Sequence, residues 1–266
     1  MLTSCQIISY THLLNKEAFK FLENPQVNMK AKHIQKDRFI LVWDTTNRPD
    51  LKSEYEWFHA HLAFSSFIAA INIASLGIFS WGDGLGVGPI YGQYNPETNK
   101  AQLITLKQDH QQNVEEKKSL TDQDIKKTII LFLLLVKEEE NFSRSEYLRG
   151  VIHLSINHFD INFHREAFSN FYRSFEYFVA RKILKTNKLK NELKQMQEVL
   201  SMYGAEDDLV DDFKEIYKLR SSQIMHAQNE QLPITYDDAR KIKAYADLLM
   251  HKFYRNEADK LRKKEK

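Results

Sequence analysis

Cysteine is almost absent from this sequence. The single one, Cys5, has no second thiol in the chain to pair with, which excludes an intramolecular disulfide framework and a cysteine-based zinc cluster. Such cysteine usage is typical of a reducing compartment. The first residues, MLTSCQIISYTHLLNKEAFKF, also lack the basic segment and long apolar core of a secretory signal. We therefore expect a cytoplasmic protein.

Long hydrophobic runs are lacking too. The apolar run from Thr128 to Val136 is much shorter than the roughly 20 residues that a membrane-spanning helix needs. The longer stretch from Ala60 to Gly82 carries no charge, but serine and asparagine interrupt it at positions 65, 66, 72 and 75. We expect both runs to be buried in a protein core, and we expect no membrane partner.

A strong net charge of either sign is missing as well. The chain has 38 basic and 36 acidic side chains, a net charge of +2, which does not by itself indicate a nucleic-acid-binding protein. Residues 1–142 have 15 basic and 17 acidic side chains, and residues 143–266 have 23 and 19. The carboxyl-terminal part is therefore mildly basic, at +4 against −2.

Glycine is scarce, and five of the eight glycines fall between Gly82 and Gly92. The sequence GDGLGVG in this region superficially resembles a phosphate-binding loop, but no Lys-Ser or Lys-Thr pair follows it. The next residues read as strand, turn and strand, in the segments PIYGQY, NPETN and AQLITLK. We expect a loop followed by a hairpin here, and not a nucleotide site.

The period of the hydrophobic pattern changes along the chain. Before residue 121, runs rich in β-branched and aromatic residues predict strands at 38–46 and 76–81, with a helix from about 51 to 74 between them. Beyond this point the helical period dominates, and Thr121 and Thr235 each begin a capping-box pattern. The predicted helices are 121–139, 143–159, 163–186, 189–203, 207–228 and 235–258.

These patterns predict two domains and an α+β fold class. Residues 1–142 form an N-terminal mixed α/β domain, to which the sequence assigns no role. Residues 143–266 form an all-α domain. Its last four helices have short connections, which predicts a four-helix bundle.

One arginine interrupts the apolar face of the helix predicted at 207–228. At about 100° per residue, the apolar side chains of this segment share one face, and Arg220 lies within it. These side chains are Leu209, Phe213, Ile216, Tyr217, Ile224 and Ala227. A guanidinium group stays protonated in a protein, so it needs a carboxylate, a phosphate or water. One interpretation is a structural ion pair with Glu176, at the edge of the aromatic stripe of the helix predicted at 163–186.

The second interpretation is functional, because His226 follows Arg220 by six residues. On an ideal helix the two lie about 120° apart and about 9 Å along the axis, so their side chains do not point together. They meet if the arginine reaches round, if the helix is distorted, or if a second copy of the chain supplies one of them. The last alternative predicts a homodimer through the helical domain. A solvated histidine near a helix end is the other interpretation of His226.

The residues around this pair resemble a known family. The sequence YKLRSSQIMHA, preceded by the aromatic helix FYRSFEYFVARKIL and followed by an amphipathic helix, is similar to the HEPN superfamily of helical-bundle domains. The family signature is an arginine, four to six residues and a histidine on the third helix, and Arg220 and His226 match it. The resemblance covers roughly residues 150–256. Glu176 falls where many members carry an acidic residue, and Ser221 stands where active members often have Asn, Asp or His.

The resemblance implies a metal-independent endoribonuclease, often a toxin or an antiviral abortive-infection effector, with its site formed across a dimer. His226 would move protons while a ribose 2′-hydroxyl attacks its own phosphodiester, and Arg220 would hold the phosphate. Glu176 and Ser221 would support them. RNA is then the substrate, an antitoxin or another protein is a further expected partner, and no metal or cofactor is required.

Two other functions are compatible with the same residues. A non-catalytic bundle would bind nucleotide, RNA or a protein, with Arg220 serving the structure alone. A regulatory subunit would leave the chemistry to another protein. Outside the bundle, His59 and His61 are candidate metal ligands, but on a helix we expect them to face different directions.

Overall fold

The computed structural model describes residues 2–23, 27–44, 53–81, 90–95, 100–105, 117–138, 142–158, 161–221 and 233–264. Within these ranges the fold is of the mixed α+β class, with a small antiparallel sheet near the N-terminus followed mostly by helices. The predicted class is confirmed at this level of description.

The N-terminal sheet has the strand order β3-β4-β1-β5, and its neighbouring strands run antiparallel. The strands are β1 (Leu2–Ser9), β3 (Met29–Lys32), β4 (Arg38–Asp44) and β5 (Phe79–Trp81). Ile7 pairs with Phe39, and both side chains are fully buried on one face together with Leu41. The predictions for β4 and β5 are confirmed. β1 and β3 were missed, because their polar residues weaken the alternation of apolar side chains.

Shorter strand pairs accompany this sheet. β2 (His12–Leu13) pairs in parallel with β8 (Lys118–Ser119). The predicted hairpin is present as β6 (Ile90–Asn95) and β7 (Lys100–Thr105). β9 (Asn157–His158) and β10 (Ile161–Asn162) pair just before the central helix of the second half. A 3-10 helix, η1 (Ala18–Leu22), follows β2, and the glycine-rich residues 82–89 lie outside the described ranges.

Helix α1 (Ser53–Ser75) contains most of the charge-free stretch of the sequence, which begins at Ala60, and most side chains of that part are apolar and buried. It contacts β4 and β5 of the sheet and, on its other sides, α2 (Asp122–Leu135), α3 (Phe142–Ser155) and α7 (Tyr236–Lys264). Because other elements cover most of this part of the helix, it needs no continuous polar face. Within the described ranges, no helix is long and apolar enough to cross a membrane.

The second half of the chain is built from α3, α4 (His164–Tyr177), α5 (Glu192–Met202), α6 (Asp207–Leu219) and α7. The helix predicted at 163–186 is not α-helical throughout. It continues from α4 as a π-helical segment, η2 (Phe178–Ile183), in which the amide of Leu184 donates to the carbonyl of Val179. The helix predicted at 143–159 ends at Ser155, because β9 begins two residues later.

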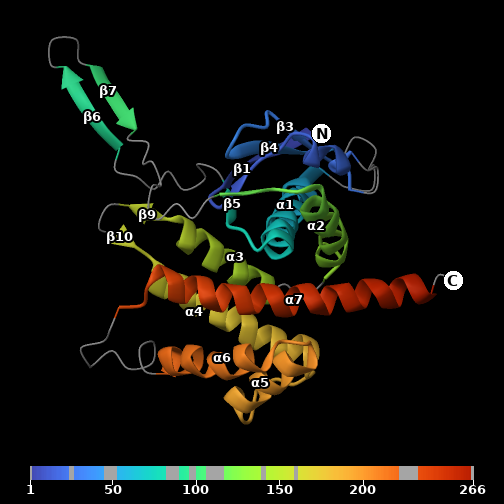
Figure 1. Cartoon of the computed structure of the whole chain (residues 1–266). Helices are drawn as coiled ribbons and strands as arrows, with labels where there is room; N and C mark the ends of the chain where they lie inside the picture. The colour runs from blue at the N-terminus through green and yellow to red at the C-terminus, as the bar shows by residue number, and fades with distance from the viewer. Residues whose placement is uncertain are drawn as a thin grey trace.

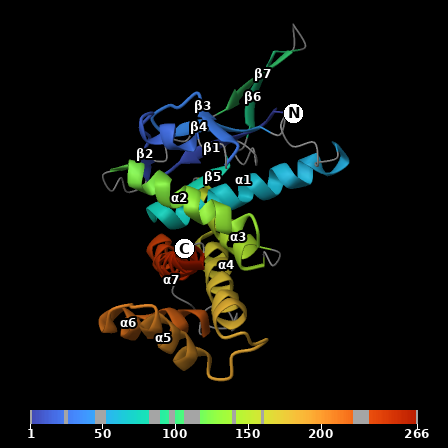
Figure 2. The same ribbon diagram turned by 90° about the vertical axis from the view of Figure 1, so that its right-hand side faces the viewer.

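The elements form successive layers. Figure 1 shows the sheet above α1 and α2, then α7 and α4, and α5 and α6 below them. Figure 2, turned by 90°, shows the same order. α4 packs against α3 and α7, α5 packs against α6, and α6 contacts α7.

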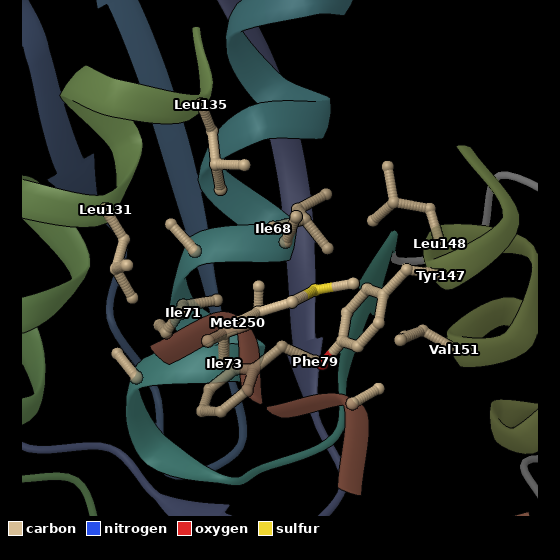
Figure 3. Packing of buried hydrophobic residues seen from close by; sticks show 14 of the residues in the cluster. Ile68, Ile71, Ile73, Phe79, Leu131, Leu135, Tyr147, Leu148, Val151 and Met250 are labelled. Carbon is tan, nitrogen blue, oxygen red and sulfur yellow. The ribbon is translucent and has the colours of Figure 1, made fainter. Parts of the chain in front are cut away.

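The buried hydrophobic residues form one continuous cluster that joins the two halves of the chain. In Figure 3, side chains from α1, β5, α2, α3 and α7 converge, among them Ile68, Phe79 and Met250. Arg144 of α3 is also buried in this region, and it donates to the hydroxyl of Ser66 on α1 at 3.0 Å and to the carbonyl of Leu135 at 2.6 Å. The boundary at residue 142 stays a prediction, and the helices on its two sides share a core.

Candidate functional site

Arg220 is the C-cap residue of α6, and its side chain is 23% exposed. Its Nη1 atom lies 3.6 Å from Oε2 of Glu192, the first residue of α5. The guanidinium carbon lies 5.3 Å from the ring centroid of Tyr172 on α4, a cation–π distance. Three helices therefore hold this guanidinium group, which keeps partial access to solvent.

Tyr172 connects α4 to the same carboxylate. Its ring is 1% exposed, and its hydroxyl donates to Oε1 of Glu192 at 2.7 Å. Glu192 thus accepts from the tyrosine through one oxygen and faces the arginine with the other. Burial raises the pKa of the Tyr172 phenol, and the neighbouring Glu192 carboxylate raises it further. The phenol is therefore a permanent hydrogen-bond donor at neutral pH.

Glu176 lies one turn further along α4 and is half-buried. Burial raises the pKa of its carboxyl group, the charge of Glu192 adds to the effect, and the charge of Arg220 opposes it. Two carboxyl groups thus share one guanidinium. The carboxyl group of Glu176 is therefore more easily protonated than that of an ordinary glutamate.

Glu192 is the partner that the sequence analysis missed. Glu176 was predicted to pair with Arg220, and the carboxylate at ion-pair distance is that of Glu192, with Glu176 acting at longer range. The reason is tertiary: α5 and α6 pack as an antiparallel pair, which brings the first residue of α5 beside the end of α6. The sequence did show an acidic residue near the start of a predicted helix. It did not show which helices pack against each other.

The apolar face predicted around Arg220 is partly confirmed. Phe213 and Ile216 are buried, Tyr217 is half-buried, and Leu209 is 40% exposed, so the prediction was wrong for Leu209. This leucine lies in the first turn of α6, where the carbonyl of the same residue accepts from the hydroxyl of Tyr245 at 2.8 Å.

The remaining residues of the motif follow directly after this cluster. Ser221 is half-buried beside Arg220. His226, Ile224 and Ala227 lie outside the described residues, as does the rest of the predicted helix to residue 228. The structure therefore places Glu176, Glu192 and Tyr172 around Arg220, and Ser221 follows Arg220 in the chain, while the position of His226 stays a prediction.

A second polar cluster lies in the core, where no motif indicated one. Lys243 and Asp247, one turn apart on α7, form an ion pair with 2.6 Å between Nζ and Oδ2, and their side chains are 4% and 1% exposed. The hydroxyl of Tyr147 on α3 donates to the other oxygen of Asp247. Lysine and aspartate at i, i+4 also pair on solvated helix surfaces, so this spacing by itself does not show that the pair is buried.

Among the described residues, no group of three or more potential ligands is placed to hold a metal ion. The imidazole of His61 stacks on Trp81 at 6.4 Å. Burial raises the pKa of the Cys5 thiol to about 11, which keeps it protonated at neutral pH.

Comparison of the chain with known protein families, with curated proteins and with solved structures finds no significant match.

Proposed function

We propose that the chain is a metal-independent endoribonuclease of the HEPN type, with α4, α5, α6 and α7 as its bundle. The single observation that carries the proposal is the state of Arg220. It is a partly exposed guanidinium group, oriented by Glu192 and Tyr172, and it stands six residues before a histidine in the family's spacing.

The proposed role of Arg220 is to bind the scissile phosphate. A guanidinium group has five N–H donors in a planar fork, and the contact with Glu192 engages only the Nη1 end. The other donors suit the phosphate oxygens, whose negative charge increases in the transition state. Glu192 and Tyr172 limit the rotation of the side chain, so less entropy is lost when substrate binds.

Glu176 and Ser221 are proposed to support this role. A carboxyl group with a raised pKa is more readily protonated, and a protonated carboxyl donates a hydrogen bond to a phosphate oxygen instead of repelling it. The hydroxyl of Ser221 is a further donor next to Arg220 in the chain. These two residues therefore assist substrate binding, and the proton transfers are left to His226.

His226 is the proposed general acid–base group. Imidazole titrates near neutral pH, as removal of a proton from the 2′-hydroxyl and protonation of the 5′-leaving oxygen require. The reaction breaks the bond between phosphorus and the 5′ oxygen and forms a 2′,3′-cyclic phosphate. No metal takes part in this scheme.

The test is a gel assay of RNA cleavage by the wild type, His226→Ala and Arg220→Ala, with a thermal melt of each protein. Both variants should lose on the order of 100- to 10,000-fold in rate, with products ending in 2′,3′-cyclic phosphate and 5′-hydroxyl. Cleavage should survive EDTA and should fail on a substrate with deoxyribose at the cleavage position. Lys214→Ala, which removes an exposed charge from the same helix, is the control and should cleave normally. Equal rates for wild type and His226→Ala would refute the proposal.

The proposed active form is a homodimer through the helical domain. A second copy can supply the histidine that an ideal helix would direct away from Arg220. Sedimentation at micromolar concentration should show a dimer. Mixing inactive Arg220→Ala with inactive His226→Ala should restore part of the activity if the site is composite, and a fully active monomer would contradict it.

A toxin or antiviral effector is the proposed biological role of this activity. Expression of the wild type should arrest cell growth and degrade RNA, and His226→Ala should do neither. An antitoxin, if the system has one, should relieve the arrest and co-purify with the chain. If an active enzyme leaves growth unaffected, the proposal of ribonuclease activity stands and the proposal of a toxin role is refuted.

A non-catalytic binding module is the second candidate, and the ion pair between Arg220 and Glu192 favours it, because a paired guanidinium group also serves structure alone. In that case Arg220→Ala should lower the melting temperature strongly while binding of RNA, nucleotide or protein persists. A regulatory subunit would show instead as stable co-purification with an enzyme.

A further inference from the structure

A buried carboxylate organises two arginines where α3 packs against α4. The side chain of Glu146 on α3 is only 1% exposed. Its Oε1 accepts from Nη1 of Arg149 at 2.7 Å, and its Oε2 accepts from Nε of Arg173 on α4 at 2.8 Å and also from Nη2 of that arginine. One carboxylate therefore joins two guanidinium groups from two helices.

The two arginines retain unused hydrogen-bonding capacity. Their side chains are 62% and 50% exposed, in contrast to the buried Glu146 between them. Of the five N–H donors in each guanidinium, Arg149 directs one to Glu146, and Arg173 directs two there and has a longer contact of 3.4 Å with Asn170. The remaining donors find no acceptor among the residues that the structure describes. Two positive charges also face one negative charge, so the cluster has a surplus of +1.

A histidine completes the edge of this cluster. The amide Nδ2 of Asn170 lies 2.8 Å from Nδ1 of His153, and the Oδ1 of the same amide accepts from Arg173. Because an amide nitrogen only donates, Nδ1 of His153 accepts and its proton is on Nε2. The imidazole stacks on the ring of Phe163 at 5.7 Å. Burial lowers the pKa of His153, the charge of Arg149 lowers it further, and the charges of Glu166 and Glu146 oppose this.

We propose that Arg149 and Arg173 form a binding site for a phosphoryl anion, either a phosphate of the RNA backbone or that of a free nucleotide. Both guanidinium groups hold oxygens of the same carboxylate, which brings their free donors within reach of one tetrahedral anion. Arginine forks match phosphate oxygens bidentately. Glu146 is buried, so it anchors the pair in place and does not reach out to repel a ligand on the solvent side.

The position of the cluster relates it to the proposed cleavage site. Arg173 and Glu176 are three residues apart on α4 and therefore neighbours on its surface. In this proposal an RNA bound at Arg220 extends along α4 and places a further phosphate at Arg173. This choice of the RNA backbone as the source of the anion rests on the proposed function, whereas phosphate binding by the two arginines does not.

The test measures binding by the full chain to three probes: inorganic phosphate, a nucleoside monophosphate, and a fluorescent RNA whose 2′-O-methyl riboses prevent cleavage. Arg149→Gln is the main variant, because Arg173 still pairs with Glu146 and the fold is preserved, which a thermal melt verifies. Arg149→Lys keeps the charge but loses the fork. Arg262→Gln removes an exposed charge with an i,i+3 partner elsewhere on the surface and is the matched control.

Arg149→Gln should weaken binding of the favoured probe at least about tenfold, as expected for charge-assisted hydrogen bonds. Arg149→Lys should weaken it less, and Arg262→Gln should match the wild type. Phosphate should also raise the pKa of His153, followed by NMR of its imidazole, in the wild type and not in Arg149→Gln. An unchanged affinity in Arg149→Gln, or equal losses in Arg262→Gln, would overturn the proposal.

The probes also separate this site from the proposed function. Preference for RNA supports a backbone phosphate, and equal or tighter binding of the monophosphate supports a nucleotide. If no RNA is cleaved while phosphate binding still depends on Arg149, the site stands and the ribonuclease proposal fails. If cleavage depends on His226 but the affinity for every probe is the same in Arg149→Gln and the wild type, the ribonuclease proposal stands and the proposed anion site is refuted.

Discussion

The hydroxyl of Tyr147 on α3 donates to the carboxylate of Asp247 on α7 at 2.5 Å, across 100 residues of sequence. Both side chains are at most 1% exposed, and the second oxygen of Asp247 accepts from Lys243 at 2.6 Å. The ammonium group also lies 5.5 Å from the Tyr147 ring. Asp247 therefore forms a buried ion pair with Lys243 through one oxygen and accepts a hydrogen bond from the Tyr147 phenol through the other. These contacts connect α3 and α7 in the interior of the fold.

Asp247→Ala should be the most destabilising of the substitutions considered. It leaves the Lys243 ammonium buried without a counter-charge, and breaking a buried pair in this way costs about 3–5 kcal/mol. Urea unfolding followed by circular dichroism measures the loss. The double variant Lys243→Met with Asp247→Leu should recover most of it, because an apolar pair of similar volume removes both charges together. Equal stability of Asp247→Ala and the wild type would mean that water reaches Lys243.

Glu192→Gln should reduce RNA cleavage with little effect on stability. The amide oxygen still accepts from Tyr172, but the charge that holds Arg220 is lost, so the guanidinium group becomes less well oriented. A fall of roughly tenfold in kcat is the expected cost of weaker positioning, with RNA affinity unchanged or higher because one negative charge is removed.

Glu198→Gln is the matched control for this change, since Glu198 lies on the same helix with a side chain that is 61% exposed. It should cleave like the wild type. If Glu192→Gln instead lowers the melting temperature and leaves kcat unchanged, Arg220 serves structure only.

Gly150→Ala should destabilise the packing of α3 against α4. A Cβ atom on Gly150 would lie 2.8 Å from two ring carbons of Phe171, which is fully buried. Neither helix can shift freely, because Glu146 and Arg173 link them nearby. Overpacking of this kind costs about 1–3 kcal/mol, measurable as a lower urea midpoint. Adding Phe171→Leu should recover part of the lost stability, because it removes the clashing ring. If stability is not recovered, the clash with Phe171 is not the cause of the loss.

Acidification should destabilise the fold through His12. This imidazole is 4% exposed, stacks on Phe79 and lies with Nδ1 at 2.9 Å from the hydroxyl of Thr11. Burial lowers its pKa below the ordinary value of about 6.5. As the pH falls through 6.5 the unfolded chain therefore binds a proton that the folded chain does not, and stability decreases.

Urea midpoints at pH 7.5 and pH 5.5 test this expectation. The wild type should be less stable at the lower pH, and His12→Gln should show a smaller difference, because glutamine does not titrate. The difference should not vanish, since burial also lowers the pKa of His153, His164 and His251. A pH dependence identical in both proteins would show that His12 is neutral or charged alike in both states.

Local patterns in the sequence were enough to predict most of the helices and one hairpin. Thr121 and Thr235 form the predicted capping boxes. In each, the threonine hydroxyl accepts from the backbone amide of the aspartate three residues on, and the threonine backbone amide donates to the carboxylate of that aspartate. The hairpin β6–β7 and the helix α1 were predicted for the same reason: turn residues and apolar periods act within a few residues of chain. β1 and β3 were missed because their pairing with β4 compensates for weak local patterns.

The sequence by itself determined the α+β class, the position of the helices and the unusual setting of Arg220 on an apolar face. Only the tertiary structure decided what that arginine meets, because Glu192 reaches it through the antiparallel packing of α5 on α6. It also decided that Lys243 and Asp247 are buried and that Glu146 joins two arginines. The charge pattern of one helix specifies how its charged residues are spaced along that helix. Their burial and their ion-pair partners depend on which other helices pack against it. That packing is determined by residues spread over the whole chain.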